Sequence, residues 1–168
     1  MDVAALKNCR RRCAPSSRRR ARELGLTLIE LLIVIALIGI IAAIAVPALS
    51  QQLERIKVRR AIVDLVTLAF EVERYEDAND DLPASLNDLD LPARIDPWGH
   101  AYVYFKFGGP GWRGEARKDR FLVPINSTFD LYSVGRDGES RPPLQNPKSL
   151  DDIIRANDGA FYGFAKDF

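Results

Sequence analysis

The sequence predicts an α+β protein in which a long N-terminal helix packs on a small three-stranded antiparallel sheet. Three observations point to this fold. The 19 residues Leu31–Leu49 carry no polar side chain, a helical pattern continues from there to Tyr75, and three later segments are rich in aromatic and β-branched residues. A chain of 168 residues has room for one modest core, so a multi-domain enzyme is not expected.

Charge divides the chain into two parts. Residues 1–25 contain eight basic and two acidic residues, whereas the remainder contains 16 basic and 21 acidic residues. A basic surface for nucleic acid is therefore confined to residues 1–25, and we expect the acidic remainder to bind no nucleic acid. Both cysteines, Cys9 and Cys13, lie in the basic segment, so a chain that has lost it has no disulfide and no cysteine-ligated metal.

The apolar run Leu31–Leu49 predicts a membrane helix. At about 1.5 Å per helical residue it spans roughly the hydrocarbon core of a bilayer. Because the arginine-rich segment precedes it, the positive-inside rule keeps residues 1–25 in the cytoplasm and sends the C-terminal domain across the membrane. Cleavage of a signal peptide after Ala45 or Ala48 is the alternative, although the run is long for a signal peptide.

The helix is expected to continue beyond the membrane. Pro47 removes a backbone donor, but the helical pattern resumes after it, so a kink is expected there and not an end. The continuation is predicted to pack one apolar face on its own domain, with Asn79-Asp80-Asp81 ending the helix. The residues of that face are Leu53, Ile56, Val63, Val66, Phe70 and Tyr75.

The remaining segments are predicted to form a loop and a meander. The loop covers 77–95, with one short helix at 85–89, and the only histidine, His100, is interpreted as a turn residue because no second histidine or cysteine accompanies it. The aromatic tail 158–168 is expected to pack on the sheet or on a neighbouring subunit. The three predicted strands are 101–107, 120–125 and 129–134.

Two aspartates in the segment DLYSVGRDG are candidate metal ligands. Asp130 and Asp137 are seven residues apart, in a segment that leaves a strand and enters a glycine-containing turn. They can direct carboxylates and backbone carbonyls at one point, which suits a hard cation such as Ca²⁺. A simple turn at Asp137-Gly138 explains the same residues without a metal.

A processing signal precedes the apolar run. Glu30 stands where an ionised carboxylate is costly without a cationic partner. The string Gly25-Leu26-Thr27-Leu28-Ile29-Glu30, after a basic leader, resembles the prepilin signal of type IV pilins and type II secretion pseudopilins. The resemblance implies that a prepilin peptidase cuts between Gly25 and Leu26 and methylates the Leu26 amine. Glu30 would then neutralise the amine of a neighbouring subunit.

The resemblance also implies three regions and a fold. They are a leader at 1–25, a transmembrane and filament-core helix at 26–50, and a periplasmic domain at 51–168. The order of the helix, DPWGHAY, DLYSVGRDG and a later Asp151-Asp152-Ile153 is similar to the major pseudopilins of type II secretion, and so implies a type IV pilin-like fold. In that family this region holds a structural Ca²⁺, which implies side-chain ligands from Asp130 and Asp137 and carbonyls from Ser127 and Gly135.

The implied function is structural and not enzymatic. The protein would polymerise into a periplasmic pseudopilus that drives protein export, with the prepilin peptidase, an inner-membrane assembly platform and minor pseudopilins as partners. One alternative is a type IV pilin or minor pilin for adhesion, motility or DNA uptake. Another is a membrane-anchored hydrolase that uses Asp130, Asp137, Asp151 and Asp152, but the sequence offers no nucleophile and base to accompany them.

Overall fold

The computed structural model describes residues 26–91 and 95–168. The chain forms two compact units, Met1–Ala43 and Ile44–Phe168. The α-helices are α1 Leu28–Asn79 and α2 Trp112–Glu115, and the strands are β1 Val103–Lys106, β2 Phe129–Ser133, β3 Ile153–Ala156 and β4 Phe161–Phe164. Short 3-10 helices are η1 Leu86–Asp88, η2 Pro147–Ser149, η3 Asn157–Gly159 and η4 Ala165–Asp167.

The long helix is confirmed. α1 continues through Pro47 and ends at Asn79, where the sequence predicted its end. Asp80 follows with a φ of 55°, a left-handed conformation that cannot continue the helix. By length and composition α1 can cross a membrane, and its apolar part lies near the N-terminus. Its side chains in the first unit are exposed, as expected for a segment whose surroundings are lipid or other subunits.

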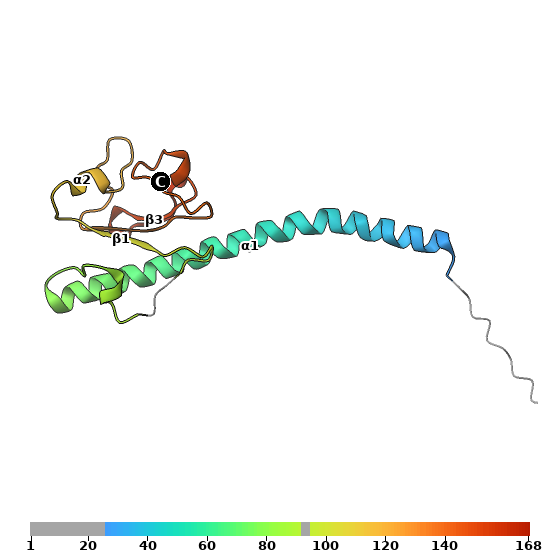
Figure 1. The fold of residues 1–168 in the computed structure, drawn as a ribbon, viewed down its shortest axis with the longest axis horizontal. Helices are drawn as coiled ribbons and strands as arrows, with labels where there is room; N and C mark the ends of the chain where they lie inside the picture. The colour runs from blue at the N-terminus through green and yellow to red at the C-terminus, as the bar shows by residue number, and fades with distance from the viewer. Residues whose placement is uncertain (1–25, 92–94) are drawn as a thin grey trace, which may run out of the picture. The chain divides into compact units, whose positions relative to one another are not determined.

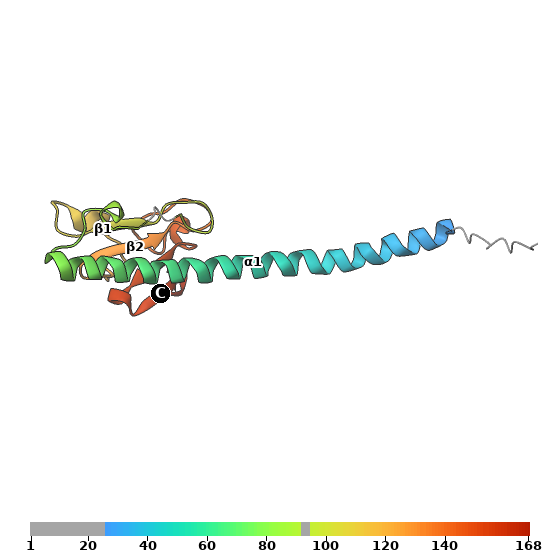
Figure 2. The same cartoon turned by 90° about the horizontal axis from the view of Figure 1, so that it is seen from below.

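The sheet of the second unit is antiparallel with the strand order β1-β2-β3-β4. Tyr132 on β2 pairs with Val103 on β1 and with Ile154 on β3, so β2 lies inside the sheet. Within this unit the later part of α1 runs along one face of the sheet, while α2 and the chain's C-terminus lie on the other face (Figure 1). Seen from the helix side, β1 and the C-terminal segment emerge on opposite sides of α1 (Figure 2).

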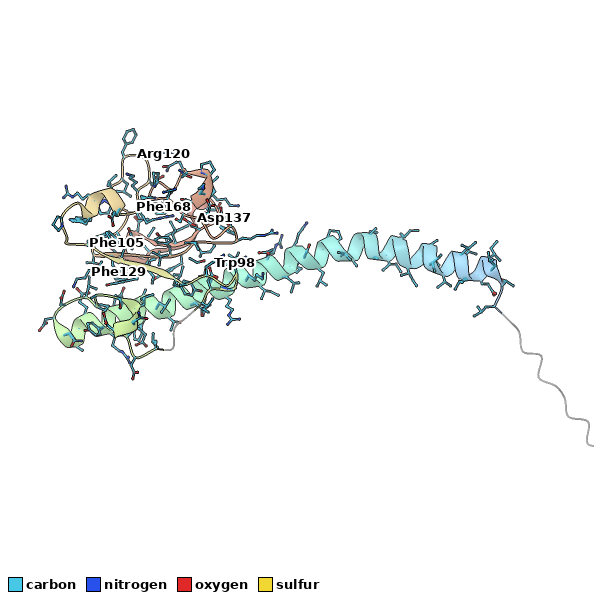
Figure 3. All side chains as sticks on the ribbon, in the orientation of Figure 1. Trp98, Phe105, Arg120, Phe129, Asp137 and Phe168 are labelled. Carbon is cyan, nitrogen blue, oxygen red and sulfur yellow. The ribbon has the colours of Figure 1, made fainter. Side chains whose placement is uncertain are left out.

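Each face of the sheet has its own apolar core. Phe129 and Trp98 lie on the side that faces α1, and Phe168 lies on the other side (Figure 3). The helix-side core buries Ala61, Leu65, Leu68, Ala69, Val72, Leu89, Tyr102, Phe129, Leu131 and Ile153. The core on the far side buries Ile125, Leu144, Ile154, Ala156 and Ala165, with Phe161 and Phe168 packed against them.

The prediction of three strands was wrong in part. The first and third predicted strands are β1 and β2, but residues 120–125 form no strand. Asp119 and Leu122 instead bond each other's backbone at 3.0 and 2.7 Å, which makes a tight turn, and Pro124 has no N–H to offer a sheet. The missing strands are β3 and β4, and β4 comes from the aromatic tail, which therefore packs inside its own domain.

The predicted apolar face of α1 was also wrong. Of its six residues only Tyr75 packs against the core, and the other five are 45% to 63% exposed. The helix instead buries the opposite face, formed by Ala61, Leu65, Leu68, Ala69 and Val72. Two alanines on that face let the helix axis approach the sheet closely. α1 thus carries two apolar stripes, and helical periodicity alone cannot tell which one its own sheet covers.

Candidate functional site

The N-terminal site begins at a helix cap. Thr27 precedes α1, and its hydroxyl accepts a hydrogen bond from the Glu30 backbone N–H at 3.3 Å. Glu30 in turn accepts the Thr27 backbone N–H at 2.9 Å and the Thr27 hydroxyl at 2.8 Å through its Oε2. This reciprocal arrangement is a capping box, which satisfies two otherwise unpaired groups at the start of the helix. Glu30 therefore fixes where α1 begins, a role that sequence reasoning missed although the spacing T-x-x-E signals it.

The predicted cleavage point lies beside this cap. Leu26 is 82% exposed and lies one residue before Thr27, outside the helix. Gly25 and the basic leader lie outside the described residues. An amine created on Leu26 would stand next to the cap formed by Thr27 and Glu30, so the charged end and its candidate partner lie at the same end of α1.

Asp130 is buried and bonded within the protein. It is 1% exposed, and its Oδ2 accepts the Arg117 backbone N–H at 2.6 Å. Its Oδ1 accepts the Asn126 side-chain amide at 2.9 Å, and that amide also donates to the Arg155 carbonyl at 3.0 Å. Burial is the largest influence on this carboxyl and raises its pKa. Both carboxylate oxygens of Asp130 thus hold β2 to the loop that precedes it, one through the Arg117 backbone and the other through the Asn126 side chain.

Asp137 contacts residues other than those that Asp130 contacts. Its side chain accepts the Glu139 backbone N–H at 2.8 Å, which makes it a turn residue. Its own backbone N–H, at 3.1 Å, and that of Arg136, at 2.9 Å, donate to Oδ2 of Asp151. Asp137 therefore lies beside Asp151, and the contacts of Asp130 are with other residues. Figure 3 places Asp137 at one end of the sheet.

The two predicted carbonyl ligands have separate neighbours as well. The Gly135 carbonyl accepts a hydrogen bond from Nδ1 of His100 at 3.1 Å. The Ser127 backbone N–H donates to Oδ1 of Asp158 at 2.7 Å. Among residues 26–91 and 95–168, no three His, Cys, Asp or Glu side chains are placed to hold one metal ion. The contacts do not gather the four predicted ligands around one point, so the residues as they stand do not fit the expected calcium shell, and calcium binding stays a prediction.

A buried ion pair between Arg117 and Asp152 holds part of the C-terminal segment in place. Arg117 is 2% exposed, and its Nη2 contacts Asp152 Oδ2 at 2.6 Å. The same guanidinium donates to the Arg141 carbonyl at 2.9 Å and to Ser140, and it lies 4.4 Å from the centre of the Tyr132 ring. These contacts tie the loop before β2 to the loop before β3. Arg113, Lys118 and Arg120 lie close to Arg117 in the sequence, and no local pattern marks Arg117 as the basic residue that is buried.

One family model matches the N-terminal part of the chain. The family model described as "Prokaryotic N-terminal methylation motif" matches residues 20–46, which include Gly25, Leu26 and the capping box. No solved structure matches the chain.

Several curated proteins named type II secretion system core protein G are similar to the chain. The protein from Pseudomonas aeruginosa is 28% identical over 142 residues, which cover 72% of this chain and 89% of the relative. The one from Xanthomonas campestris is 29% identical over 143 residues, covering 76% and 89%. The one from Escherichia coli is 28% identical over 141 residues, covering 70% and 85%. The chain thus carries a prokaryotic N-terminal methylation motif and is similar over most of its length to core protein G of type II secretion systems.

Proposed function

We propose that the protein is a structural subunit of a pseudopilus, a periplasmic filament that drives protein export by type II secretion. The observation that carries the proposal is the similarity to core protein G, which covers 70% to 76% of this chain and 85% to 89% of the relatives quoted. The fold supports it, because one apolar helix that can anchor the chain in a membrane continues into a small α+β domain.

The proposed maturation has three steps. The chain enters the inner membrane with residues 1–25 in the cytoplasm and residues 51–168 in the periplasm. A prepilin peptidase cuts between Gly25 and Leu26 and methylates the new amine. An inner-membrane assembly platform then moves the subunit into the filament, together with minor pseudopilins. Intact-mass measurement of the protein from membranes tests this, since a methylated chain that begins at Leu26 is expected, and an uncleaved chain or one cut near Ala48 would refute it.

Glu30 is proposed to pair with the Leu26 amine of a neighbouring subunit. Once both groups are inside an apolar helix bundle, either charge alone costs several kcal/mol, so the pair selects the position at which a new subunit stops. The capping box makes the test of this role less direct, because removing Glu30 also weakens the start of α1.

Two variants separate the charge of Glu30 from its capping role. Glutamine is also suited to this capping position, so Glu30→Gln keeps the cap and removes the charge, whereas Glu30→Ala removes both. We expect both variants to be cleaved and inserted normally, and both to fail in filament assembly and secretion in cells that lack the unmodified subunit. Normal secretion with Glu30→Gln would refute the proposed pairing. Failure of Glu30→Ala alone would assign the residue to helix capping.

The carboxylates that a hydrolase would need are used in the structure itself. Asp130 binds Arg117 and Asn126, and Asp152 binds Arg117. Asp151 accepts two backbone N–H groups, and Asp137 accepts one. These roles support a subunit without enzymatic activity. Long surface pili made by cells that express this subunit alone would instead favour a type IV pilin.

A further inference from the structure

A groove with an apolar floor lies between α1 and the C-terminal strand β4. Val58 on α1, Phe164 on β4 and Trp98, in the turn before β1, form the floor. Two hollows of about 250 and 220 Å³ share Val58 and Phe164, so they make one continuous groove. Figure 3 shows Trp98 at the end of the sheet domain where α1 leaves it toward its N-terminus.

Four exposed basic side chains also line this groove. Arg55 and Arg59 lie about one turn apart on α1, and Arg136 and Lys166 belong to the segments that follow β2 and β4. Within residues 26–91 and 95–168, none of the four forms an ion pair. We call the apolar floor together with these four residues the basic groove.

The acidic residues of the groove already have partners in the protein. Oε2 of Glu54 accepts the Trp98 Nε1–H at 3.1 Å, and Oε1 of Glu54 lies 3.9 Å from Lys57 Nζ. Oδ2 of Asp151 accepts two backbone N–H groups of the turn after β2. The four basic side chains therefore have no acidic partner inside the groove, and positive charge surrounds an apolar floor. This combination suits an amphiphilic ligand with an anionic head.

The basic groove begins close to the membrane surface. The apolar run ends at Leu49, and Arg55 and Arg59 follow it by six and ten residues, or about 9 and 15 Å along the helix. The headgroup layer extends about 5–8 Å beyond the hydrocarbon core. Side chains of a helix tilt toward its N-terminus, so both arginines lean toward this layer. Tryptophan is also common at this level of membrane proteins, as Trp98 is here.

We propose that the basic groove binds the headgroup of an anionic phospholipid of the membrane that anchors the chain. The phosphate pairs with the basic side chains, since a guanidinium group matches two phosphate oxygens at once. The glycerol and the upper part of an acyl chain cover Val58 and Phe164. A free phosphate ion would leave this apolar floor in water, which favours the lipid. The inference rests on the proposed function only in placing the chain in the inner membrane.

Native mass spectrometry of the full-length protein counts the bound lipids directly. The protein is released from detergent micelles that contain either phosphatidylglycerol or phosphatidylcholine with the same acyl chains. A basic residue near an anionic surface contributes roughly a fivefold preference, so the complex with one phosphatidylglycerol should be at least about fivefold more abundant than that with phosphatidylcholine. Equal retention of the two lipids would overturn the proposal.

Two neighbouring arginines provide matched variants. Arg59 and Arg60 are both exposed on α1, but Arg60 lies about 200° around the helix from Val58 and lines neither hollow. Arg59→Gln should lower the phosphatidylglycerol complex roughly fivefold, and Arg60→Gln should leave it unchanged. An equal loss in both variants would show a diffuse attraction of the basic helix to an anionic surface, and would overturn binding in the groove.

The fluorescence of Trp98 tests where the lipid binds. The chain has two tryptophans, so Trp112→Phe leaves Trp98 as the only one. In nanodiscs of phosphatidylcholine with rising fractions of phosphatidylglycerol, Trp98 emission should change until it saturates, and Arg59→Gln should weaken this response. An absent response would overturn the proposal. A response of the same size to inorganic phosphate or to a polyglutamate peptide, in nanodiscs of phosphatidylcholine alone, would assign the groove to that ligand and overturn the lipid.

These measurements are independent of the proposed function. They use the purified protein, so selective lipid binding by a chain that supports no secretion would uphold the basic groove and count against the export role. Secretion that depends on this protein, without selective lipid binding, would do the reverse.

Discussion

The two faces of α1 should respond differently to substitution. A change on the buried face should lower the stability of the domain strongly, and a change on the exposed face should leave it nearly unaltered. Leu65 is fully buried against the sheet, and Val63, two residues earlier, is 63% exposed. Leu65→Ala removes buried methyl groups from a packed core and leaves a cavity, which costs about 2–5 kcal/mol. Val63→Ala uncovers nothing in the monomer, and alanine favours the helix, so its effect should stay within about 0.5 kcal/mol.

Thermal unfolding of the full-length protein in detergent, followed by near-ultraviolet circular dichroism, measures this difference. For a unit of the size of Ile44–Phe168, each kcal/mol shifts the midpoint by about 3–5 °C, so Leu65→Ala should lower Tm by about 6–25 °C. Val63→Ala should leave Tm within about 3 °C of the unmodified protein. A large fall in Tm with Val63→Ala and none with Leu65→Ala would show that the exposed stripe is the core face and refute the packing described here.

Three further predictions concern the buried charges. Arg117→Met should lower the free energy of unfolding by about 3–5 kcal/mol in urea titrations, because it leaves the Asp152 carboxylate buried without its partner; a loss below 1 kcal/mol, roughly the value of a surface pair, would contradict this. Burial raises the pKa of Asp152 from 3.8 to about 6, so the folded state holds its proton more tightly than the unfolded state does. The tighter proton binding of the folded state stabilises the protein fully below about pH 4, and this stabilisation is lost as the pH rises through about 6. Asp152→Asn should therefore abolish the fall of the urea midpoint over this pH range. An unchanged pH profile would argue against this role of Asp152. Asp130→Asn should lower Tm equally in Ca²⁺ and in chelator, because its oxygens bind Arg117 and Asn126, whereas a loss confined to Ca²⁺ would identify Asp130 as a ligand.

The N-terminal site could be predicted almost entirely from the sequence. Its chemistry lies within six consecutive residues, Gly25 to Glu30, so no distant part of the chain has to be placed. The apolar run behind it follows from composition alone. The capping box was not predicted, although it depends only on two residues three positions apart and the T-x-x-E spacing signals it.

The C-terminal half was less predictable because its contacts are distant in the sequence. β3 and β4 were not predicted, although β1, which is equally short, was; β4 contains Gly163, and glycine weakens a strand pattern. The predicted calcium ligands were inferred from spacing along one segment. In the structure Asp130 bonds with a backbone group 13 residues away, and Asp152 with an arginine 35 residues away.

The sequence by itself determined the N-terminal methylation motif, the helix long and apolar enough to cross a membrane, the position of the helix end and the α+β class, because each of these depends on residues that are close along the chain. Only the tertiary structure decided which stripe of α1 faces the sheet and which one stays open. Both stripes have helical spacing and apolar side chains, and the choice between them depends on how the sheet fits against the small residues Ala61 and Ala69. That fit arises from contacts between segments far apart in the chain, which no local pattern encodes.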